Sequence, residues 1–185
     1  MTEARTSLTH PLRIDAVECG SGLLGITFCP GKCSESIHGA RWERDLATDL
    51  DVICRWGASA IVTLVEEDEL KLLCVPDLGA QVRNKGLDWY HLPIVDLSAP
   101  GPEFEAAWPG VTPSLRATLL VGGRVVVHCR GGLGRAGTVA ACMLVETGIA
   151  PEEAIRRVRS ARPGAIETVS QQQYVRHYRA RHAAV

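Results

Sequence analysis

The stretch HCRGGLGR at residues 128–135 joins two segments of different character, and it decides how the rest of the chain is interpreted. The β-branched segment VVV at residues 125–127 precedes it and favours a buried strand. Residues 139–145 follow it and form an apolar stretch that favours a helix. The three glycines inside the stretch allow positive φ angles and a close approach of the backbone. The sequence therefore predicts a strand, a tight loop and the N-terminus of a helix.

The residues of this loop have the chemistry of an anion site. Backbone N–H groups that turn inward at a helix N-terminus bind an anion, and the same positive field holds a thiol such as Cys129 as the thiolate. Arg135, six positions later, offers a planar fork for two oxygens of a phosphate. The combination predicts phosphoryl transfer to cysteine.

Other interpretations of the loop fit less well. A Walker-type phosphate loop is excluded, because no Gly-Lys-Ser/Thr follows. A zinc site needs more ligands, and only His128 lies beside Cys129 at ligand spacing. The remaining alternative is a glycine-rich turn with a buried structural cysteine. The joint occurrence of histidine, cysteine, glycines and arginine between a strand and a helix favours the anion site.

Strands are predicted to alternate with helices around this unit. The predicted strands cover residues 12–17, 23–28, 60–65, 87–94 and 124–129. The predicted longer helices cover residues 43–56, 104–120, 135–148 and 151–161, and Pro109 and Pro113 make the first half of the second one irregular. Two short helices are also predicted, one opened by the acidic run 66–69 and one that ends near residue 82. A last helix is capped by Ser170 and ends at about residue 182. This alternation predicts an α/β fold with a central, mainly parallel sheet flanked by helices. The loop lies at the carboxyl end of a strand, where such sheets bind ligands.

Length and composition fit one domain. The chain has 185 residues, of which 46% are hydrophobic, and we expect a flexible tail at residues 1–11 and a single domain at 12–185. Seven cysteines with irregular spacing argue against a disulfide framework and fit a reducing compartment. Neither a signal-peptide pattern nor an apolar run of membrane-spanning length stands out, so we expect a cytoplasmic protein.

The formal net charge of −1 gives no global field that would attract nucleic acid. The charge is unevenly divided, however. Residues 1–123 carry ten Lys/Arg and seventeen Asp/Glu, whereas residues 124–185 carry ten Arg and four Glu. The basic part contains the predicted anion loop, which is compatible with steering of an anionic substrate and equally with solvated helix faces.

The segment 128–135 resembles the signature loop His-Cys-x5-Arg of the cysteine-dependent protein tyrosine and dual-specificity phosphatases. It is most similar to the kinase-associated, cyclin-dependent kinase inhibitor 3-like branch of that superfamily. Further similarity to this branch lies at residues 24–31, in HLPIVD at 91–96 and in AIETVSQ at 165–171. The resemblance extends over about residues 23–180 and implies the dual-specificity-like fold.

A phosphocysteine mechanism needs a general acid, because the leaving oxygen must be protonated as its bond to phosphorus breaks. Asp96 follows a predicted strand, lies in a loop of Pro, Ser and Gly that could move over the site, and matches the family's acid. Asp88 is a weaker alternative, because it lies inside the strand pattern.

The resemblance implies roles for the other matching residues. Cys129 attacks phosphorus and Arg135 binds the phosphate. His128 hydrogen-bonds near the cysteine and keeps the cysteine pKa low. Gln171 positions water for the second step, whereas its neighbours Gln172 and Gln173 match no role. The implied phosphate-binding set is Arg130, Gly131, Gly132, Leu133, Gly134 and Arg135, with no metal and no cofactor.

Two positions depart from the family pattern. Ala136 stands where the family has Ser or Thr, whose hydroxyl bonds the thiolate and helps it to leave. We therefore expect a higher thiolate pKa and slower phosphoenzyme breakdown than in relatives, unless Thr138 supplies the hydroxyl. Glu167 stands where many relatives have a glutamine, and it could orient water or repel the substrate phosphate.

The leading functional hypothesis is a phosphatase for phosphotyrosine or phosphoserine/threonine in proteins. A phosphoinositide or other small phosphoester is the second hypothesis, with which Arg130 agrees and Leu133 does not. A phospho-binding protein with little or no catalysis is the third, and only Ala136 supports it. The expected partner is a phosphoprotein or phosphoester, with no nucleic acid and no membrane span; a kinase-containing partner is implied by the family resemblance alone.

Cysteines outside the loop have no role that the sequence can assign. Residues 29–33 form a Cys-x3-Cys turn, and metal binding there would need two further ligands that are not evident. A second cysteine could in principle resolve an oxidised Cys129, but its identity depends on geometry. The candidates are Cys19, Cys29, Cys33, Cys54, Cys74 and Cys142.

Overall fold

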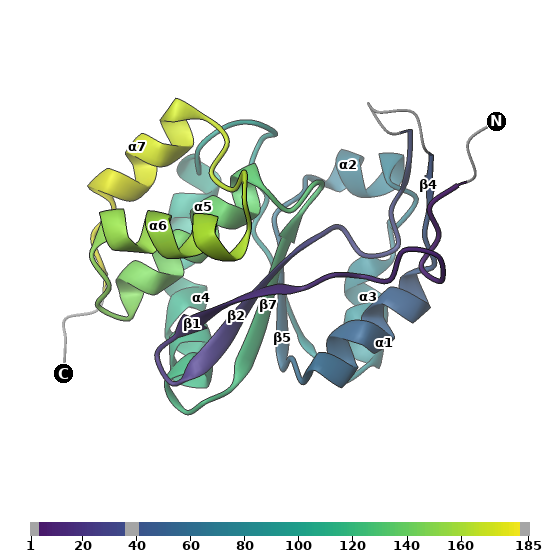
Figure 1. Ribbon diagram of the computed structural model, residues 1–185, viewed down its shortest axis with the longest axis horizontal. Helices are drawn as coiled ribbons and strands as arrows, with labels where there is room; N and C mark the ends of the chain where they lie inside the picture. Colours follow the sequence, from purple (N-terminus) through teal and green to yellow (C-terminus); the bar gives the residue numbers. More distant parts are fainter. Residues whose placement is uncertain (1–3, 36–40, 182–185) are drawn as a thin grey trace.

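A computed structural model describes residues 4–35 and 41–181 of the chain (Figure 1). Its centre is a five-stranded sheet in the order β1-β2-β7-β5-β6, in which β1 is antiparallel to β2 and the other pairs are parallel. The strands are β1 (Asp15–Cys19), β2 (Gly22–Phe28), β5 (Ala60–Thr63), β6 (Asp88–His91) and β7 (Arg124–Cys129), with β3 (Cys33–Ser34) and β4 (Trp42–Glu43) forming a separate small sheet.

Helices lie on both sides of the sheet. Figure 1 shows α1 to α3 on one side and α4 to α7 on the other. Their bounds are α1 (Leu46–Trp56), α2 (Glu67–Leu72), α3 (Leu78–Asn84), α4 (Pro102–Leu120), α5 (Gly134–Glu146), α6 (Pro151–Ala161) and α7 (Val169–His177). The predicted α/β class with a mainly parallel sheet flanked by helices is confirmed. No helix in the described ranges has both the length and the apolar character to cross a membrane.

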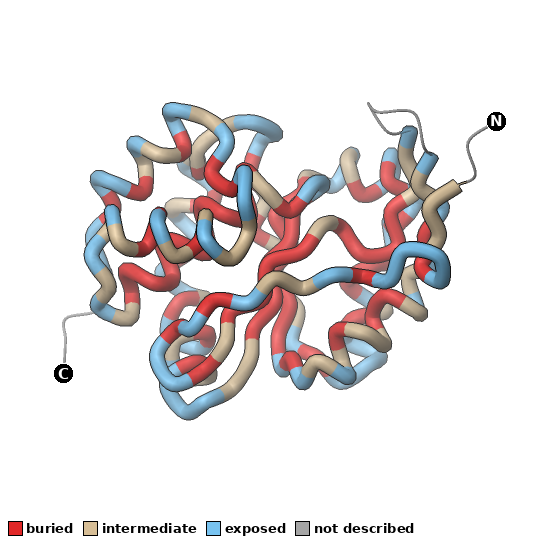
Figure 2. Tube along the Cα trace, viewed as in Figure 1, coloured by how far each residue is buried: buried red, intermediate tan, exposed pale blue. Residues whose placement is uncertain are grey.

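The strand–loop–helix unit at residues 124–146 lies at the centre of the core. Strand β7 pairs with β2 on one side and β5 on the other, and every residue of α5 is buried. Figure 2 shows the central strands as the buried middle of the molecule. The loop between β7 and α5 is therefore held at both ends by packed, buried elements, which restricts its geometry.

Several helices differ from the sequence prediction. Helix α1 begins at Leu46 rather than at Glu43, which belongs to β4, and α5 ends at Glu146 rather than at residue 148. Helix α4 runs without interruption through Pro109 and Pro113. Its apolar face is buried against the sheet, and the guanidinium of Arg181 donates a hydrogen bond to the Glu105 carbonyl, which Pro109 leaves without its helical partner. Helix α7 is capped by Thr168 rather than by Ser170, and it ends at His177 rather than near residue 182.

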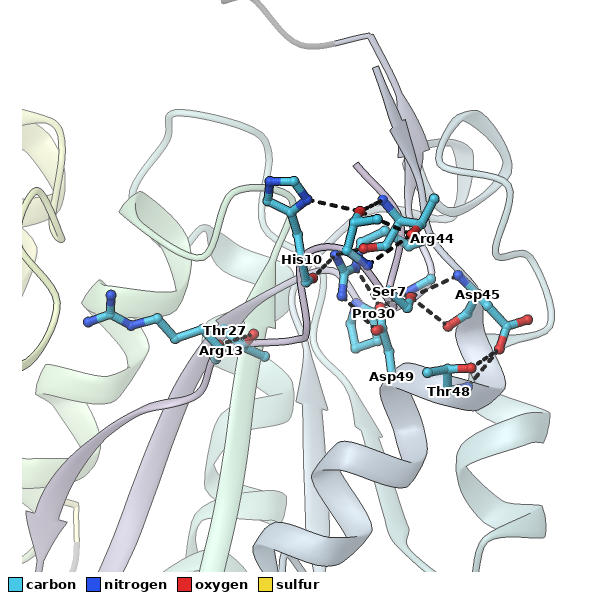
Figure 3. Close-up of polar contacts among 12 residues, drawn as sticks. Ser7, His10, Arg13, Thr27, Pro30, Arg44, Asp45, Thr48 and Asp49 are labelled. Atoms are coloured by element: carbon cyan, nitrogen blue, oxygen red, sulfur yellow. Dashed lines mark hydrogen bonds and ion pairs between the residues drawn. The ribbon is translucent and has the colours of Figure 1, made fainter. Parts of the chain in front are cut away.

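The N-terminal segment lies against the domain where it is described. Residues 1–3 of the expected flexible tail lie outside the described residues. Figure 3 shows Arg44 between His10 and Asp49: it donates to the His10 carbonyl at 2.7 Å and forms a bidentate ion pair with Asp49. Ser7 is buried and bonds Asp45, the N-cap of α1. These contacts tie residues before β1 to the start of α1.

Candidate active site

Cys129 is the last residue of β7, and it is 3% exposed. The N–H of Gly132 donates to its Sγ at 3.2 Å. Gly132 has φ +70°, and a Cβ at this position would lie 2.3 Å from the Thr27 carbonyl oxygen of β2. Only glycine fits there, because a side chain would have both backbone strain and a clash. The glycine thus brings a backbone donor to the thiol.

The carbonyl groups of the loop are bonded from outside it. The Arg130 carbonyl accepts from the Cys29 N–H and from Lys32 Nζ. The Gly131 and Gly132 carbonyls accept from the Arg162 guanidinium. The Leu133 carbonyl accepts from the N–H groups of Gly137 and Ile166. The loop N–H groups of residues 130, 131 and 133 have no acceptor among the described residues. A loop with its carbonyls satisfied on one side presents N–H groups on the other, as an anion site requires.

Arg135 is the second residue of α5, and it is 1% exposed. Its Nη1 donates to Glu69 Oε2 at 2.5 Å and to the Ile94 carbonyl at 2.9 Å, while its Nη2 donates to Glu69 Oε1 at 2.9 Å. Nη2 also lies 2.9 Å from Asp96 Oδ1. In the described part of the chain, the Nε of Arg135 is a buried polar side-chain atom without a hydrogen-bond partner. An oxygen of a bound phosphate would satisfy this donor.

Glu69 is a site residue that the sequence interpretation missed. The acidic run that contains it was assigned only to the start of a helix, and Glu69 does bond the N–H of Glu66 there in a capping box. Burial raises the pKa of Glu69, but the hydrogen bonds from Arg135 and from the N–H of Glu66, together with the charges of Arg135 and Arg130, hold that pKa below its ordinary value. Glu69 is therefore ionised and fixes the direction of the Arg135 guanidinium.

Asp96 lies in the loop after β6, with its side chain half-exposed and ion-paired to Arg135. Its Oδ1 also accepts from the N–H of Leu97, a residue with φ +60°. The structure thus brings the predicted acid to the arginine that follows the predicted nucleophile by six residues. Asp88, the weaker alternative, is excluded, because it begins β6 opposite Ala60 and so lies at the other end of the strands from Cys129.

His128 belongs to a buried chain of hydrogen bonds behind the thiol. Its Nδ1 lies 3.4 Å from the Cys129 carbonyl, which can only accept, so Nδ1 carries the proton and Nε2 accepts from Thr63 Oγ1 at 2.8 Å. The hydroxyl of Thr63 in turn accepts from Trp89 Nε1 at 2.8 Å. Burial lowers the pKa of His128 to about 4. The histidine is therefore neutral, and its contact with Cys129 is the hydrogen bond to the backbone carbonyl of that residue.

Gln171 connects α7 to the acid loop. Its Oε1 accepts from the N–H groups of Glu167 and Thr168, and its Nε2 donates to the Ser98 carbonyl of the acid loop at 3.1 Å. A Cβ on Gly134 would lie within 3 Å of the side chains of Gln171 and Glu167. Both side chains therefore flank the start of α5. Through its bond to Ser98, Gln171 also holds the acid loop in place.

Thr138 does not replace the hydroxyl that is missing at position 136. Ala136 is fully buried, and Thr138 Oγ1 donates to the Gly134 carbonyl at 2.7 Å, one turn back in its own helix. All seven cysteines are free thiols. Of the other six, Cys29 follows the residue of β2 that pairs with Cys129, which places it beside the loop.

Comparisons with known proteins agree with this geometry. Residues 41–175 match the family described as "PTP-SAK: Swiss Army Knife protein, DSP-PTPase phosphatase domain". The chain is 31% identical over 176 residues to the human protein named Cyclin-dependent kinase inhibitor 3, covering 94% of this chain and 79% of that protein. It is 31% identical over 134 residues to the human Protein tyrosine phosphatase type IVA 3, covering 72% of each.

Solved structures show the same fold. A kinase-associated phosphatase crystallised with its catalytic-site cysteine replaced by serine superimposes with a TM-score of 0.77 at 29% identity. The match covers 89% of this chain and 92% of that one. The sheet and its flanking helices thus match those of the kinase-associated phosphatase.

Proposed function

The chain belongs to the DSP-type family of cysteine-based phosphatase domains, and from this premise we propose that it hydrolyses phosphomonoesters without a metal, through a phosphocysteine intermediate. The proposed substrates are phosphotyrosine, phosphoserine or phosphothreonine in proteins, and the proposed catalytic domain is residues 12–185. The observation that carries the proposal is Arg135, buried beside Cys129, fixed by Glu69 and left with an unbonded Nε. Such a donor fits a phosphate oxygen.

In the first step, the Cys129 thiolate attacks phosphorus while loop N–H groups and Arg135 bind the equatorial oxygens. Fixed donors aimed at developing negative charge account for most of the rate enhancement at such sites. The incoming phosphate competes with Asp96 for Nη2 of Arg135 and displaces the carboxylate. The charge of the phosphate then favours the protonated carboxyl, which gives its proton to the leaving oxygen.

In the second step, water attacks the phosphocysteine and Asp96 accepts its proton. The bond from phosphorus to Sγ breaks, and the thiolate of Cys129 is restored. Gln171 supports this step by holding the acid loop through Ser98, and one N–H of its amide remains available to orient the water. His128 supports both steps through the backbone carbonyl of the nucleophile.

Two alternatives are kept as outcomes of the tests. A phosphoinositide substrate is favoured by Arg130, which is exposed at the loop and could meet a second phosphate. Binding without turnover is favoured by Ala136. The names of the relatives support the protein substrate, and the similarity to Cyclin-dependent kinase inhibitor 3 supports a kinase-containing partner. The seven free thiols support a reducing compartment such as the cytoplasm.

The deciding experiment is hydrolysis of p-nitrophenyl phosphate in EDTA by the wild type, Cys129→Ser and Asp96→Asn, between about pH 5.5 and 7.5. We expect turnover in the wild type, none in Cys129→Ser, and a loss of roughly 10²- to 10⁴-fold in Asp96→Asn, which lacks the acid. Wild-type activity that needs a divalent metal, or that survives Cys129→Ser, contradicts the mechanism.

The substrate class is tested next. Phosphopeptides and phosphoinositide vesicles are compared by kcat/KM with the same enzyme. Higher kcat/KM for phosphopeptides supports the protein phosphatase, and preference for vesicles that is lost in Arg130→Leu supports the lipid alternative. Tight phosphopeptide binding by a wild type with no turnover supports the phospho-binding alternative.

A further inference from the structure

Two cationic side chains contact the outer side of the phosphate loop, and their charges differ in their surroundings. Arg162 bonds the carbonyls of Gly131 and Gly132, and its charge is paired with Asp15 at 2.7 Å. Lys32 bonds the Arg130 carbonyl at 3.2 Å, and it makes no ion pair with any carboxylate in residues 4–35 and 41–181. The loop therefore has one neutralised and one uncompensated cation behind it.

Lys32 is buried, with 8% of its surface exposed. Its ammonium lies 4.7 Å from the ring centre of Phe28 and 4.9 Å from that of Trp42. Aromatic faces offset part of the cost of removing an ammonium from water, but they leave its charge unneutralised. A cation in this low-dielectric place acts more strongly on nearby charges than one at the surface.

The turn that carries Lys32 is rigid. The N–H of Gly31 donates to Asp49 Oδ2 at 2.8 Å, and Asp49 is held by the bidentate pair with Arg44 (Figure 3). Gly31 has φ +71°, and a Cβ there would lie 2.6 Å from Leu46. The ion pair neutralises Asp49, so this carboxylate fixes the turn without cancelling the charge of Lys32.

Charged and titratable groups face Lys32 from three places. They are Cys29 after β2, Arg44 after β4, and Cys129 with Arg130 in the loop. Burial lowers the pKa of Lys32 to about 8, with Cys29 and Cys129 raising it and Arg44 and Arg130 lowering it. Lys32 is thus protonated at neutral pH and interacts with Cys129. Arg135, a further cation near the thiol, is already paired with Glu69 and Asp96.

We propose that Lys32 is a positioning residue of the phosphate loop, whose uncompensated charge stabilises the Cys129 thiolate and replaces part of the effect of the hydroxyl missing at Ala136. The proposal rests on the proposed function of this loop as a thiolate site. It also gives the turn at residues 29–33 a role, because that turn holds one cation against the back of the loop.

The test measures ionisation of the thiol without substrate. The rate of Cys129 alkylation by iodoacetamide is followed against pH by peptide mass spectrometry, in the wild type, Lys32→Met and Lys32→Arg. We expect Lys32→Met to raise the apparent thiol pKa by about one unit. At a pH below that pKa, alkylation should then be roughly tenfold slower than in the wild type. Lys32→Arg should remain near the wild type. Lys85→Met, which removes a half-exposed lysine paired with Asp51, is the matched control and leaves the pKa unchanged.

An unchanged thiol pKa in Lys32→Met, or the same rise in Lys32→Arg, overturns the proposal. A second measurement does not depend on folding of the Lys32 variants. Because coupling between two sites is reciprocal, Cys129→Ser should lower the pKa of Lys32. This pKa is measured by NMR of ¹³Cε-labelled lysine in the full chain. No shift in Cys129→Ser overturns it as well. Both readouts work in a protein that hydrolyses no phosphate, so failure here is distinguishable from failure of the proposed function.

Discussion

The proposed function requires three things of the Arg135 guanidinium. It must have a fixed orientation, a carboxylate partner when no substrate is bound, and an N–H donor that is available to the substrate. Glu69 supplies the orientation by bonding both terminal nitrogens, and Asp96 is the exchangeable partner. The difference follows from exposure, since the Glu69 side chain is 14% exposed and that of Asp96 is 50% exposed. In the proposed mechanism, the more exposed carboxylate is therefore the one that leaves when phosphate enters.

In the proposed mechanism, the residue after Arg135 influences the second step. Ala136→Ser would restore a hydroxyl that can donate to the sulfur as the phosphocysteine breaks, and Thr138 does not compete because its hydroxyl is bonded within α5. We expect faster phosphoenzyme hydrolysis, by about 3- to 10-fold, corresponding to one neutral hydrogen bond of roughly 1 kcal/mol. Burst kinetics with p-nitrophenyl phosphate measure the two steps separately.

The control for this substitution is Ala140→Ser, which adds the same hydroxyl one turn later in the buried helix. It should leave both phases of the burst unchanged. A hydrolysis rate in Ala136→Ser equal to that of the wild type would show that the missing hydroxyl does not limit turnover in this chain.

The element that shapes the site is the turn from β7 into α5, and two adjacent glycines in it differ in their surroundings. Gly132→Ala places a Cβ 2.3 Å from the Thr27 carbonyl at φ +70°. We expect a loss of about 2–4 kcal/mol in the free energy of unfolding and a loss of activity. Gly131→Ala meets nothing within 4 Å and should change stability by less than about 0.5 kcal/mol. Urea denaturation of both variants checks this, and equal losses would be evidence against the close contact.

Helix α7 and the acid loop are coupled through one side chain. Gln171→Ala removes the bond to Ser98 together with the N3 side chain of the α7 capping box. We expect about a tenfold lower kcat, because a looser acid loop positions Asp96 less well, and a destabilisation of about 1–2 kcal/mol. Gln173→Ala, on the exposed face of the same helix, should change neither. A kcat for Gln171→Ala equal to that of Gln173→Ala would separate α7 from catalysis.

At the scale of the whole molecule, the sequence predicted what depends on neighbours in the chain. The bounds of β7 and α6 agree with the prediction, because β-branched residues, proline and apolar spacing act locally. The phosphate loop was likewise predicted from neighbouring residues, and the acid loop from its composition together with the family resemblance. The pairing of Glu69 with Arg135 joins residues 66 positions apart, and the order of the strands is likewise non-local. The small sheet of β3 and β4 and the uninterrupted α4 depend on such tertiary contacts, which local patterns do not contain.

The same long-range packing makes stability depend on the ionisation of one buried ring. His128 is fully buried between β5 and the loop, and burial lowers its pKa to about 4 in the folded state. In the unfolded chain its pKa is about 6.5. Between these values the unfolded state binds the proton and the folded state does not, so stability falls as the pH falls from about 6.5 to 4.

The expected loss from this histidine approaches about 3 kcal/mol at the lower end of that window, at up to about 1.4 kcal/mol per pH unit. His128→Gln lacks this titrating group, so its urea midpoint should decrease less steeply over the same pH range. At neutral pH the urea midpoint of His128→Gln should be lower than that of the wild type, because the hydrogen bond to Thr63 changes. His177→Gln, at an exposed position of α7, should retain the wild-type pH dependence. Carboxylates titrate equally in all three proteins, so the difference between their slopes of urea midpoint against pH isolates the contribution of His128. Parallel slopes for the wild type and His128→Gln would mean that the ring is protonated inside the fold.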